Sequence, residues 1–210
     1  MRRTVIEASR LVVVHNAWLA ARIRDEHPLA DVRVVEMGVP AGVPDAAARS
    51  RVRARHAIPA DAVVFAAFGT ATPEKRLKEA IAALAAIAGE GPDVRLLLVG
   101  QAVGHYDPRV DARDLGIDER VTVAGFVPDE DVHDYLAASD VCLCLRWPTS
   151  RETSAAWLRC LAAGRATIVT DLAHTVDVPS LDPRTWTVLY GSRGEAQAFE
   201  PPAPVEPVTV

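Results

Sequence analysis

Short apolar runs alternate with amphipathic segments along most of the chain. The runs are rich in β-branched and other apolar residues, and several are apolar almost throughout, as in VVFAAF, LLLV and VCLCL. Such runs are typical of parallel strands that helices cover on both faces of a sheet. We predict strands at residues 11–15, 32–36, 63–68, 95–99, 120–124, 141–145 and 167–170.

The segments between these runs carry helical periodicity. Leu77, Ile81 and Leu84 repeat at helical spacing and would form one buried face of a helix, which Thr72 would cap and Pro73 would open. We expect helices at residues 17–26, 45–56, 74–88, 129–138 and 152–163. This alternation predicts an α/β fold with a doubly wound, Rossmann-like parallel sheet.

The composition narrows the class of protein. The chain has 210 residues, of which 50% are hydrophobic and 24% charged, which excludes a disordered or collagen-like chain. Its formal net charge of −5 makes a nucleic-acid partner a poor expectation, since such proteins present a basic face. The first apolar run is short and interrupted by Glu7 and Arg10, so we predict neither a signal peptide nor a membrane span.

The cysteines indicate a reducing environment. There are three, and strand alternation places Cys142 and Cys144 on one face of the predicted strand 141–145. Their spacing matches neither a redox pair of the Cys-x-x-Cys type nor a zinc site. We expect buried free thiols in a cytoplasmic protein.

The first candidate binding loop follows the predicted strand 63–68. Gly69 allows the backbone to approach a ligand, Thr70 follows it, and Lys75 in the next helical turn can reach back to a phosphate. A positive charge in the first turn of a helix slightly destabilises the helix, because it lies near the positive end of the helix dipole. A ligand role therefore explains Lys75 better than simple exposure does.

A second candidate loop lies where the strand 120–124 ends. It comprises Gly125, Phe126 and Val127, followed by Pro128 at the start of a helix. Free main-chain groups at such a glycine can bind the edge of a base. An ordinary strand-to-helix turn is the alternative.

The third candidate loop precedes the predicted helix 152–163. Thr149 and Glu152 have capping-box spacing, and Arg151, Thr153 and Ser154 gather at the same helix start. Hydroxyls, free amides and an arginine at a helix N-terminus form a site suited to a phosphate or to sugar hydroxyls. Glu152 is either a cap partner or a ligand contact.

Taken in order, these loops resemble the C-terminal half of the retaining GT-B glycosyltransferases of the group 1, or GT4-like, class. The matching positions are Gly69, Lys75, the turn 125–127 and the stretch LAAGRATIV at 161–169, and residues 34–39 are similar to the family's interdomain linker. The resemblance extends over residues 11–171. It implies that Lys75 faces the donor diphosphate, that the turn holds the base, and that the helix start faces phosphate or sugar.

The resemblance also implies the ligand. A nucleotide diphosphate sugar would be the donor substrate, with no other cofactor and no metal, because no Asp-x-Asp motif lies in a suitable loop. The donor sugar, the base and the acceptor are not indicated.

Several positions depart from the family's pattern. Thr70 stands where the family has an arginine, and a hydroxyl cannot replace its paired phosphate contacts. Arg151 and Arg159 stand at the positions of the family's two glutamates, unless the register shifts by one residue and places Glu152 and Cys160 there. Two interpretations of these departures stay open. The two arginines could bind the phosphate charge, or the activity could have been lost.

Family members carry acceptor recognition in an N-terminal Rossmann-like domain. Here we predict a strand-helix-strand remnant and linker at residues 1–37, a nucleotide-sugar-binding domain at 38–195 and a Pro-rich flexible tail at 196–210. We therefore expect the donor-binding half of a glycosyltransferase, inactive without an N-terminal domain. A separate acceptor-binding domain or chain would complete it, and the acceptor could bring it to a membrane surface.

Two other interpretations stay open. The chain would be a non-catalytic nucleotide-binding or interaction module if the departures have removed activity. A GT-B-like nucleotide-sugar epimerase would need acidic residues that the sequence does not place. His15, at a strand end, is interpreted as structural, and no catalytic residue is assigned.

Overall fold

The computed structural model describes residues 2–42, 45–104, 106–148, 152–172, 175, 179–190 and 195–198. The chain divides into two compact units, of which the larger comprises residues 37–170 and the other comprises residues 1–36 and 171–210. The larger unit begins close to the predicted start of the nucleotide-sugar-binding domain at residue 38. It ends at Thr170, before the predicted end at residue 195.

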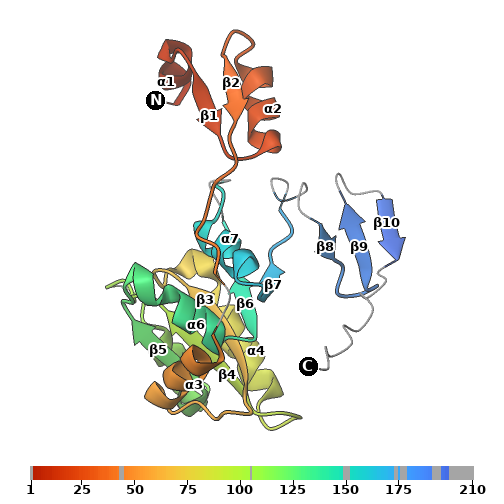
Figure 1. The fold of residues 1–210 in the computed structure, drawn as a ribbon. Coiled ribbons are helices and arrows are strands. Elements are labelled where there is room, and N and C mark those ends of the chain that lie inside the picture. The colour runs from red at the N-terminus through yellow and green to blue at the C-terminus, as the bar shows by residue number, and fades with distance from the viewer. Residues whose placement is uncertain are drawn as a thin grey trace, which may run out of the picture. The chain divides into compact units, whose positions relative to one another are not determined.

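The larger unit is built on a five-stranded parallel sheet with the order β5-β4-β3-β6-β7 (Figure 1). Its strands are β3 (Val63–Phe68), β4 (Val94–Val99), β5 (Val121–Gly125), β6 (Val141–Cys144) and β7 (Ala166–Val169). The first strand of this sheet, β3, lies in its centre. Strands β4 and β5 follow on one side of β3, and β6 and β7 then lie on the other side. The predicted doubly wound α/β fold is therefore confirmed.

Helices connect these strands and cover both faces of the sheet (Figure 1). They are α3 (Ala46–Arg55), η1 (Pro73–Lys75), α4 (Leu77–Ile87), α5 (Pro108–Asp114), η2 (Asp118–Arg120), η3 (Asp129–Asp131), α6 (Val132–Ala138) and α7 (Ala155–Ala162). The predicted helix 74–88 is split, because Arg76 adopts a left-handed conformation with φ of 56°. Thr72 precedes η1, but its side chain makes no capping bond, so the predicted cap is wrong.

Burial on both faces of the sheet explains the continuous apolar runs. Along β4, Leu97 and Val99 pack into one hydrophobic cluster, whereas Leu96 and Leu98 pack into a second cluster on the opposite face. A strand with both faces buried cannot show the polar alternation of a half-exposed strand.

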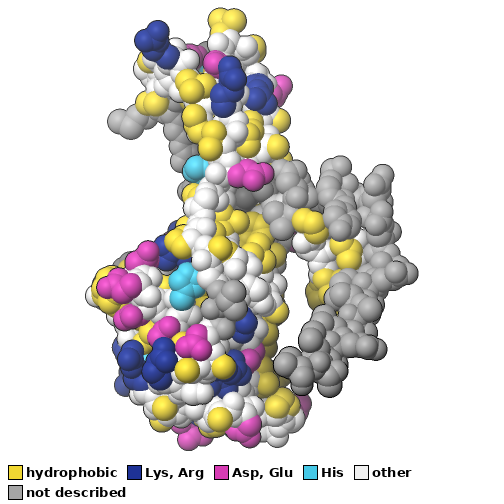
Figure 2. Space-filling view, in the orientation of Figure 1, with side chains coloured by type: hydrophobic (Ala, Val, Ile, Leu, Met, Phe, Trp, Pro, Cys, Tyr) yellow, Lys and Arg dark blue, Asp and Glu magenta, His cyan; other side chains and the backbone are white. Residues whose placement is uncertain are grey.

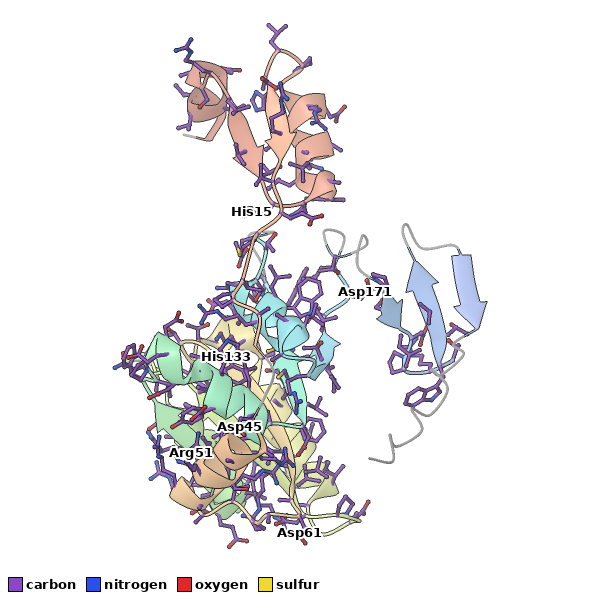
Figure 3. All side chains as sticks on the ribbon, in the orientation of Figure 1. His15, Asp45, Arg51, Asp61, His133 and Asp171 are labelled. Carbon is purple, nitrogen blue, oxygen red and sulfur yellow. The ribbon has the colours of Figure 1, made fainter. Side chains whose placement is uncertain are left out.

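Charged residues lie on the exposed faces of helices α3 and α6 in the larger unit. Figure 2 shows side chains of both signs over α3 and α6, where Arg51 pairs with Asp134 at 3.1 Å. Asp45 and Arg51, both labelled in Figure 3, lie at α3, and the Asp45 carboxylate accepts the N–H groups of Ala47 and Ala48 as the N-cap. Mixed charge on this face fits a solvated surface.

The other unit contains two small groups of elements. Its N-terminal part holds α1 (Arg2–Ala8), β1 (Val12–Val14), α2 (Ala17–Glu26) and β2 (Val32–Val34), and β1 pairs with β2 in parallel. His15, labelled in Figure 3, lies with Nδ1 2.8 Å from the carbonyl oxygen of Val35. No described helix combines the length and apolar character needed to cross a bilayer.

The C-terminal part of that unit is an antiparallel sheet that the sequence pattern did not predict. It consists of β8 (Ser180–Leu181), β9 (Thr187–Tyr190) and β10 (Glu195–Ala198), in the order β10-β9-β8. Strand β10 spans the predicted start of the tail at residue 196, and residues 199–210 of that tail lie outside the described residues.

Candidate functional site

A pocket of about 290 Å³ lies in the larger unit where strands β3 and β5 end and helix α7 begins. Residues after β3, residues after β5 and residues of α7 line it. Two of the loops singled out in the sequence therefore meet here, beside the helix that follows the third. Of the predicted site residues, its walls include Gly69, Thr70, Phe126, Val127 and Arg159. The carboxyl ends of parallel strands are where ligands bind in doubly wound sheets.

Two glycines bring the ends of β3 and β4 into close contact beside this pocket. Gly69 has φ of 84°, in the left-handed region, and its N–H donates to the Val99 carbonyl at 2.7 Å. A Cβ atom on Gly100 would lie only 2.2 Å from the Gly69 carbonyl oxygen. The path of the loop after β3 therefore depends on glycine at both positions.

Lys75 is folded back over the end of β3. Its Nζ donates to the carbonyl oxygen of Phe68 and lies 2.8 Å from the position that a Cβ on Gly69 would take. Burial lowers the pKa of Lys75 to about 8, and the nearby Arg146 guanidinium acts in the same direction. Lys75 does not line the pocket itself but is joined to two residues that do, Phe68 and Gly69.

A forked ion pair crosses part of the pocket wall. Arg159 of α7 donates from Nη1 to Oδ1 of Asp129 and from Nη2 to Oδ2, the latter at 3.0 Å. The hydrogen bond from Arg159 holds the pKa of Asp129 below its usual value. Asp129 was interpreted from the sequence only as part of a helix start. Its position directly after the 125–128 turn was the signal that could have marked it as a site residue.

The loop after β6 is tied to the loop after β3. The Trp147 N–H donates to the Glu74 carbonyl at 2.7 Å, and Arg146 Nη1 lies 2.7 Å from Oε1 of Glu152. Glu152 thus forms an ion pair in front of α7. A capping role for it is wrong, because α7 begins at Ala155, with Ser154 as its N-cap.

The other predicted residues in the described ranges do not line the pocket. Gly125 ends β5 with φ of 77°, which positions the exposed ring of Phe126 after it. Ser154 accepts the Trp157 N–H at 3.3 Å, and Thr153 precedes it. Arg151 lies outside the described residues, as does Thr149 of the predicted capping box.

Two of the cysteines, Cys144 and Cys160, lie close enough to Lys75 to interact with its charge. All three are free; Cys142 and Cys160 are buried in one hydrophobic cluster, and Cys144 is half-buried. A hydrogen bond with Cys160, together with burial, raises the pKa of Cys144 far above its usual value, so it is held as the neutral thiol. Within the described ranges, no group of His, Cys, Asp and Glu is arranged to hold a metal ion.

Comparison with known proteins gives one family match. Residues 61–191 match the family model described as "Glycosyl transferases group 1". No curated protein sequence matches the chain significantly.

Several solved structures share the fold. Sucrose-phosphate synthase from Thermosynechococcus elongatus has a TM-score of 0.67 and 23% identity, covering 83% of this chain and 45% of its own. HepE from Anabaena in complex with UDP has a TM-score of 0.68 and 20% identity, covering 83% and 48%. The C-terminal domain of a group 1 family protein (LpcC) from Francisella tularensis has a TM-score of 0.54 and 19% identity, covering 65% and 72%. The chain thus spans about half the length of the first two.

Proposed function

The chain belongs to the group 1 glycosyl transferases, and we propose that its larger unit is the donor-binding half of such an enzyme, with a nucleotide diphosphate sugar as its ligand. The observation that carries this proposal is the meeting of the first two loops with helix α7 in one pocket at the carboxyl ends of β3 and β5. HepE, which shares the fold, was solved in complex with UDP and with UDP-glucose.

The diphosphate would lie against the loop after β3 and the first turn of α7. Lys75 would turn from the Phe68 carbonyl towards it and supply positive charge, while free N–H groups near Ala155 and Ala156 complement it. Stabilising the charge on the departing diphosphate is the main electrostatic need of glycosyl transfer from such a donor. We assign that role to Lys75 rather than to a metal ion.

The base would lie against the turn after β5. Phe126 is 71% exposed and lines the pocket, so its ring offers a flat face for stacking. Val127 lines the same pocket and packs against the hydrophobic core, which holds the turn in place.

Acceptor binding is assigned to a separate domain or chain, because the chain spans about half the length of the related structures. We propose that the chain transfers no sugar without that part, and that a membrane-bound acceptor would bring it to the bilayer surface. The free cysteines suit a reducing compartment such as the cytoplasm.

A non-catalytic nucleotide-binding module is the second candidate. It is favoured by one observation: Arg159, which stands at a family glutamate position in one of the two registers of the resemblance, is engaged with Asp129 in an ion pair. The same pocket would then bind a nucleotide without promoting transfer.

Calorimetric titration tests both candidates. We would titrate the full chain with UDP, ADP, GDP and UDP-glucose, and then repeat this with Lys75→Ala and with the matched control Lys78→Ala, whose side chain is exposed. We expect one nucleoside diphosphate to bind, Lys75→Ala to weaken it about 10- to 100-fold, and Lys78→Ala to leave it unchanged. No binding by any of these ligands overturns the donor-site proposal. The module is favoured if binding occurs but no sugar transfer or hydrolysis follows when a separate acceptor-binding partner is supplied.

A further inference from the structure

The loops after strands β3 and β6 meet where the order of strands in the sheet reverses. The two strands are parallel neighbours, and β3 is followed by β4 on one side whereas β6 is followed by β7 on the other. Helices α4 and α7 pack on opposite faces of the sheet, since Leu77 and Cys160 belong to different hydrophobic clusters. Ligands of doubly wound sheets bind at such a switch point.

Each of these two loops carries a positive charge. Lys75 folds back over the end of β3, where its Nζ donates to the Phe68 carbonyl oxygen rather than to a carboxylate. Arg146 lies two residues beyond the end of β6. The two side chains are close, because the charge of Arg146 is, after burial, the largest cause of the lowered pKa of Lys75. The sheet therefore brings together two like charges, which repel each other.

A backbone hydrogen bond holds the two loops together. The Trp147 N–H donates to the Glu74 carbonyl oxygen at 2.7 Å, and these residues directly adjoin the two cations in the sequence. An anion bound between the cations would remove the repulsion between them. A diphosphate spreads its charge over several oxygens, which ammonium and guanidinium groups both bind.

Arg146 is paired with a carboxylate at the surface. Its Nη1 lies 2.7 Å from Oε1 of Glu152, and the two side chains are 47% and 38% exposed. An exposed ion pair contributes little to stability, so a phosphate can displace this carboxylate at small cost. Like Lys75, Arg146 does not line the pocket, and its side chain would turn from Glu152 to reach a ligand there. Its planar fork of N–H groups matches two phosphate oxygens.

We propose that Arg146 is a second cation of the diphosphate site, which on ligand binding exchanges the Glu152 carboxylate for phosphate oxygens beside Lys75. The charge comes from the loop after β6, whereas position 70 in the loop after β3 offers only the hydroxyl of Thr70. Glu152 thus competes with the ligand in the free protein. The inference rests on the proposed function, because it needs a diphosphate at these loops.

Calorimetric titration of the full chain with UDP, ADP and GDP tests the inference. Arg146→Ala should weaken diphosphate binding about 10- to 100-fold, the usual effect of losing a hydrogen-bonded charge. Arg146→Lys should weaken it less, because the charge stays and only the fork is lost. Glu152→Gln should strengthen binding about 2- to 5-fold, since the exposed carboxylate no longer competes for Arg146.

Arg22 and Glu26 provide a matched control pair. They form an exposed ion pair on helix α2 of the other unit, with 2.8 Å between Nη2 and Oε1. Arg22→Ala and Glu26→Gln should leave diphosphate binding unchanged. Thermal unfolding followed by circular dichroism checks that each variant is folded. Glu152→Gln, which keeps the size of its side chain, tests the inference even if Arg146→Ala does not fold.

The signs of the two effects separate a ligand role from a structural one. If Arg146 only fixes its loop through Glu152, then Arg146→Ala and Glu152→Gln weaken binding together, and that result overturns the inference. Unchanged binding in folded Arg146→Ala also overturns it and leaves Lys75 as the cation of the donor site. If the unaltered protein binds none of the nucleoside diphosphates, the proposed function is rejected together with this inference.

Discussion

Arg53 and Asp140 form an ion pair between helix α3 and the residue that precedes strand β6, with 2.8 Å between Nη2 and Oδ2. The Arg53 side chain is 3% exposed and also donates to the carbonyl oxygens of Ala62 and Ala138. Asp140 in turn accepts the Val64 N–H at 2.8 Å. The pair therefore ties α3 to the starts of two central strands, β3 and β6.

We predict that Arg53→Ala lowers the free energy of unfolding by about 3–5 kcal/mol, the range found when one partner of a buried ion pair is removed. The loss leaves several carbonyl oxygens without their donor and removes one of the two arginines that pair with Asp140, since Arg49 remains. Urea unfolding followed by circular dichroism measures the change. Arg55→Ala, on the exposed side of the same helix, should stay within about 0.5 kcal/mol of the unaltered protein. Equal effects of the two substitutions would contradict a structural role for Arg53.

The same cluster predicts how stability depends on pH. Burial alone would raise the pKa of Asp140, but the Val64 N–H and the guanidinium groups of Arg49 and Arg53 outweigh it and hold the pKa below its usual value. A carboxyl with a lowered native pKa stabilises the fold above its unfolded pKa, and this contribution is lost as pH falls through the native pKa. The free energy of unfolding should therefore decrease below about pH 4. Asp140→Asn should flatten this decrease, whereas Asp118→Asn, at an exposed site, should not.

The strands were predictable because each buried strand is a continuous run of apolar residues in the sequence. Val63–Phe68 is apolar throughout and was predicted with its observed ends. Helix α5, Pro108–Asp114, was missed because its sequence PRVDARD is short and mostly charged, so it shows no apolar stripe. Its helical form is set by the Asp107 cap and by packing of Ala112 against the core.

The candidate site was predictable only in its local parts. Glycine turns such as the one at Gly69 can be recognised in the sequence, because the glycine directly follows an apolar strand and precedes a helical segment. The pairing of Asp129 with Arg159 joins residues 30 positions apart, and no local pattern indicates it. The position of Lys75 also depends on the left-handed turn at Arg76, which only the folded backbone shows.

Gly100 is predicted to tolerate no side chain. Its Cβ would lie 2.2 Å from the Gly69 carbonyl oxygen, which is backbone and cannot swing away. Gly100→Ala should lower the free energy of unfolding by about 1–3 kcal/mol and displace the loop after β3, so nucleotide binding should weaken as well. Gly104→Ala provides the control, because a Cβ there meets nothing within 4 Å. If thermal unfolding midpoints for the two variants coincide, the close approach of the two backbones is not what fixes this loop.

Nucleotide affinity should fall as pH rises above 8. Burial and Arg146 lower the pKa of Lys75 to about 8, so the free protein loses the ammonium charge as pH passes through that value. If a diphosphate needs this charge, its Kd should rise about tenfold between pH 7 and pH 9, since a tenfold change accompanies each pH unit above the pKa. Calorimetry at several pH values measures it. Lys75→Arg keeps its charge throughout, so its binding should show no such rise, and a rise that persists in this variant assigns the titration to another group.

Restoring an arginine at position 70 should strengthen diphosphate binding. Thr70 is exposed, lines the pocket and directly follows Gly69, where the family resemblance expects an arginine. A guanidinium there adds a forked donor for phosphate oxygens that a hydroxyl cannot supply. We expect Thr70→Arg to lower the Kd of the bound nucleoside diphosphate about tenfold, and to make that Kd more sensitive to salt. Ser50→Arg, on the exposed face of α3, adds the same charge away from the pocket and should change neither quantity. An unchanged Kd in Thr70→Arg would place the diphosphate away from the loop after β3.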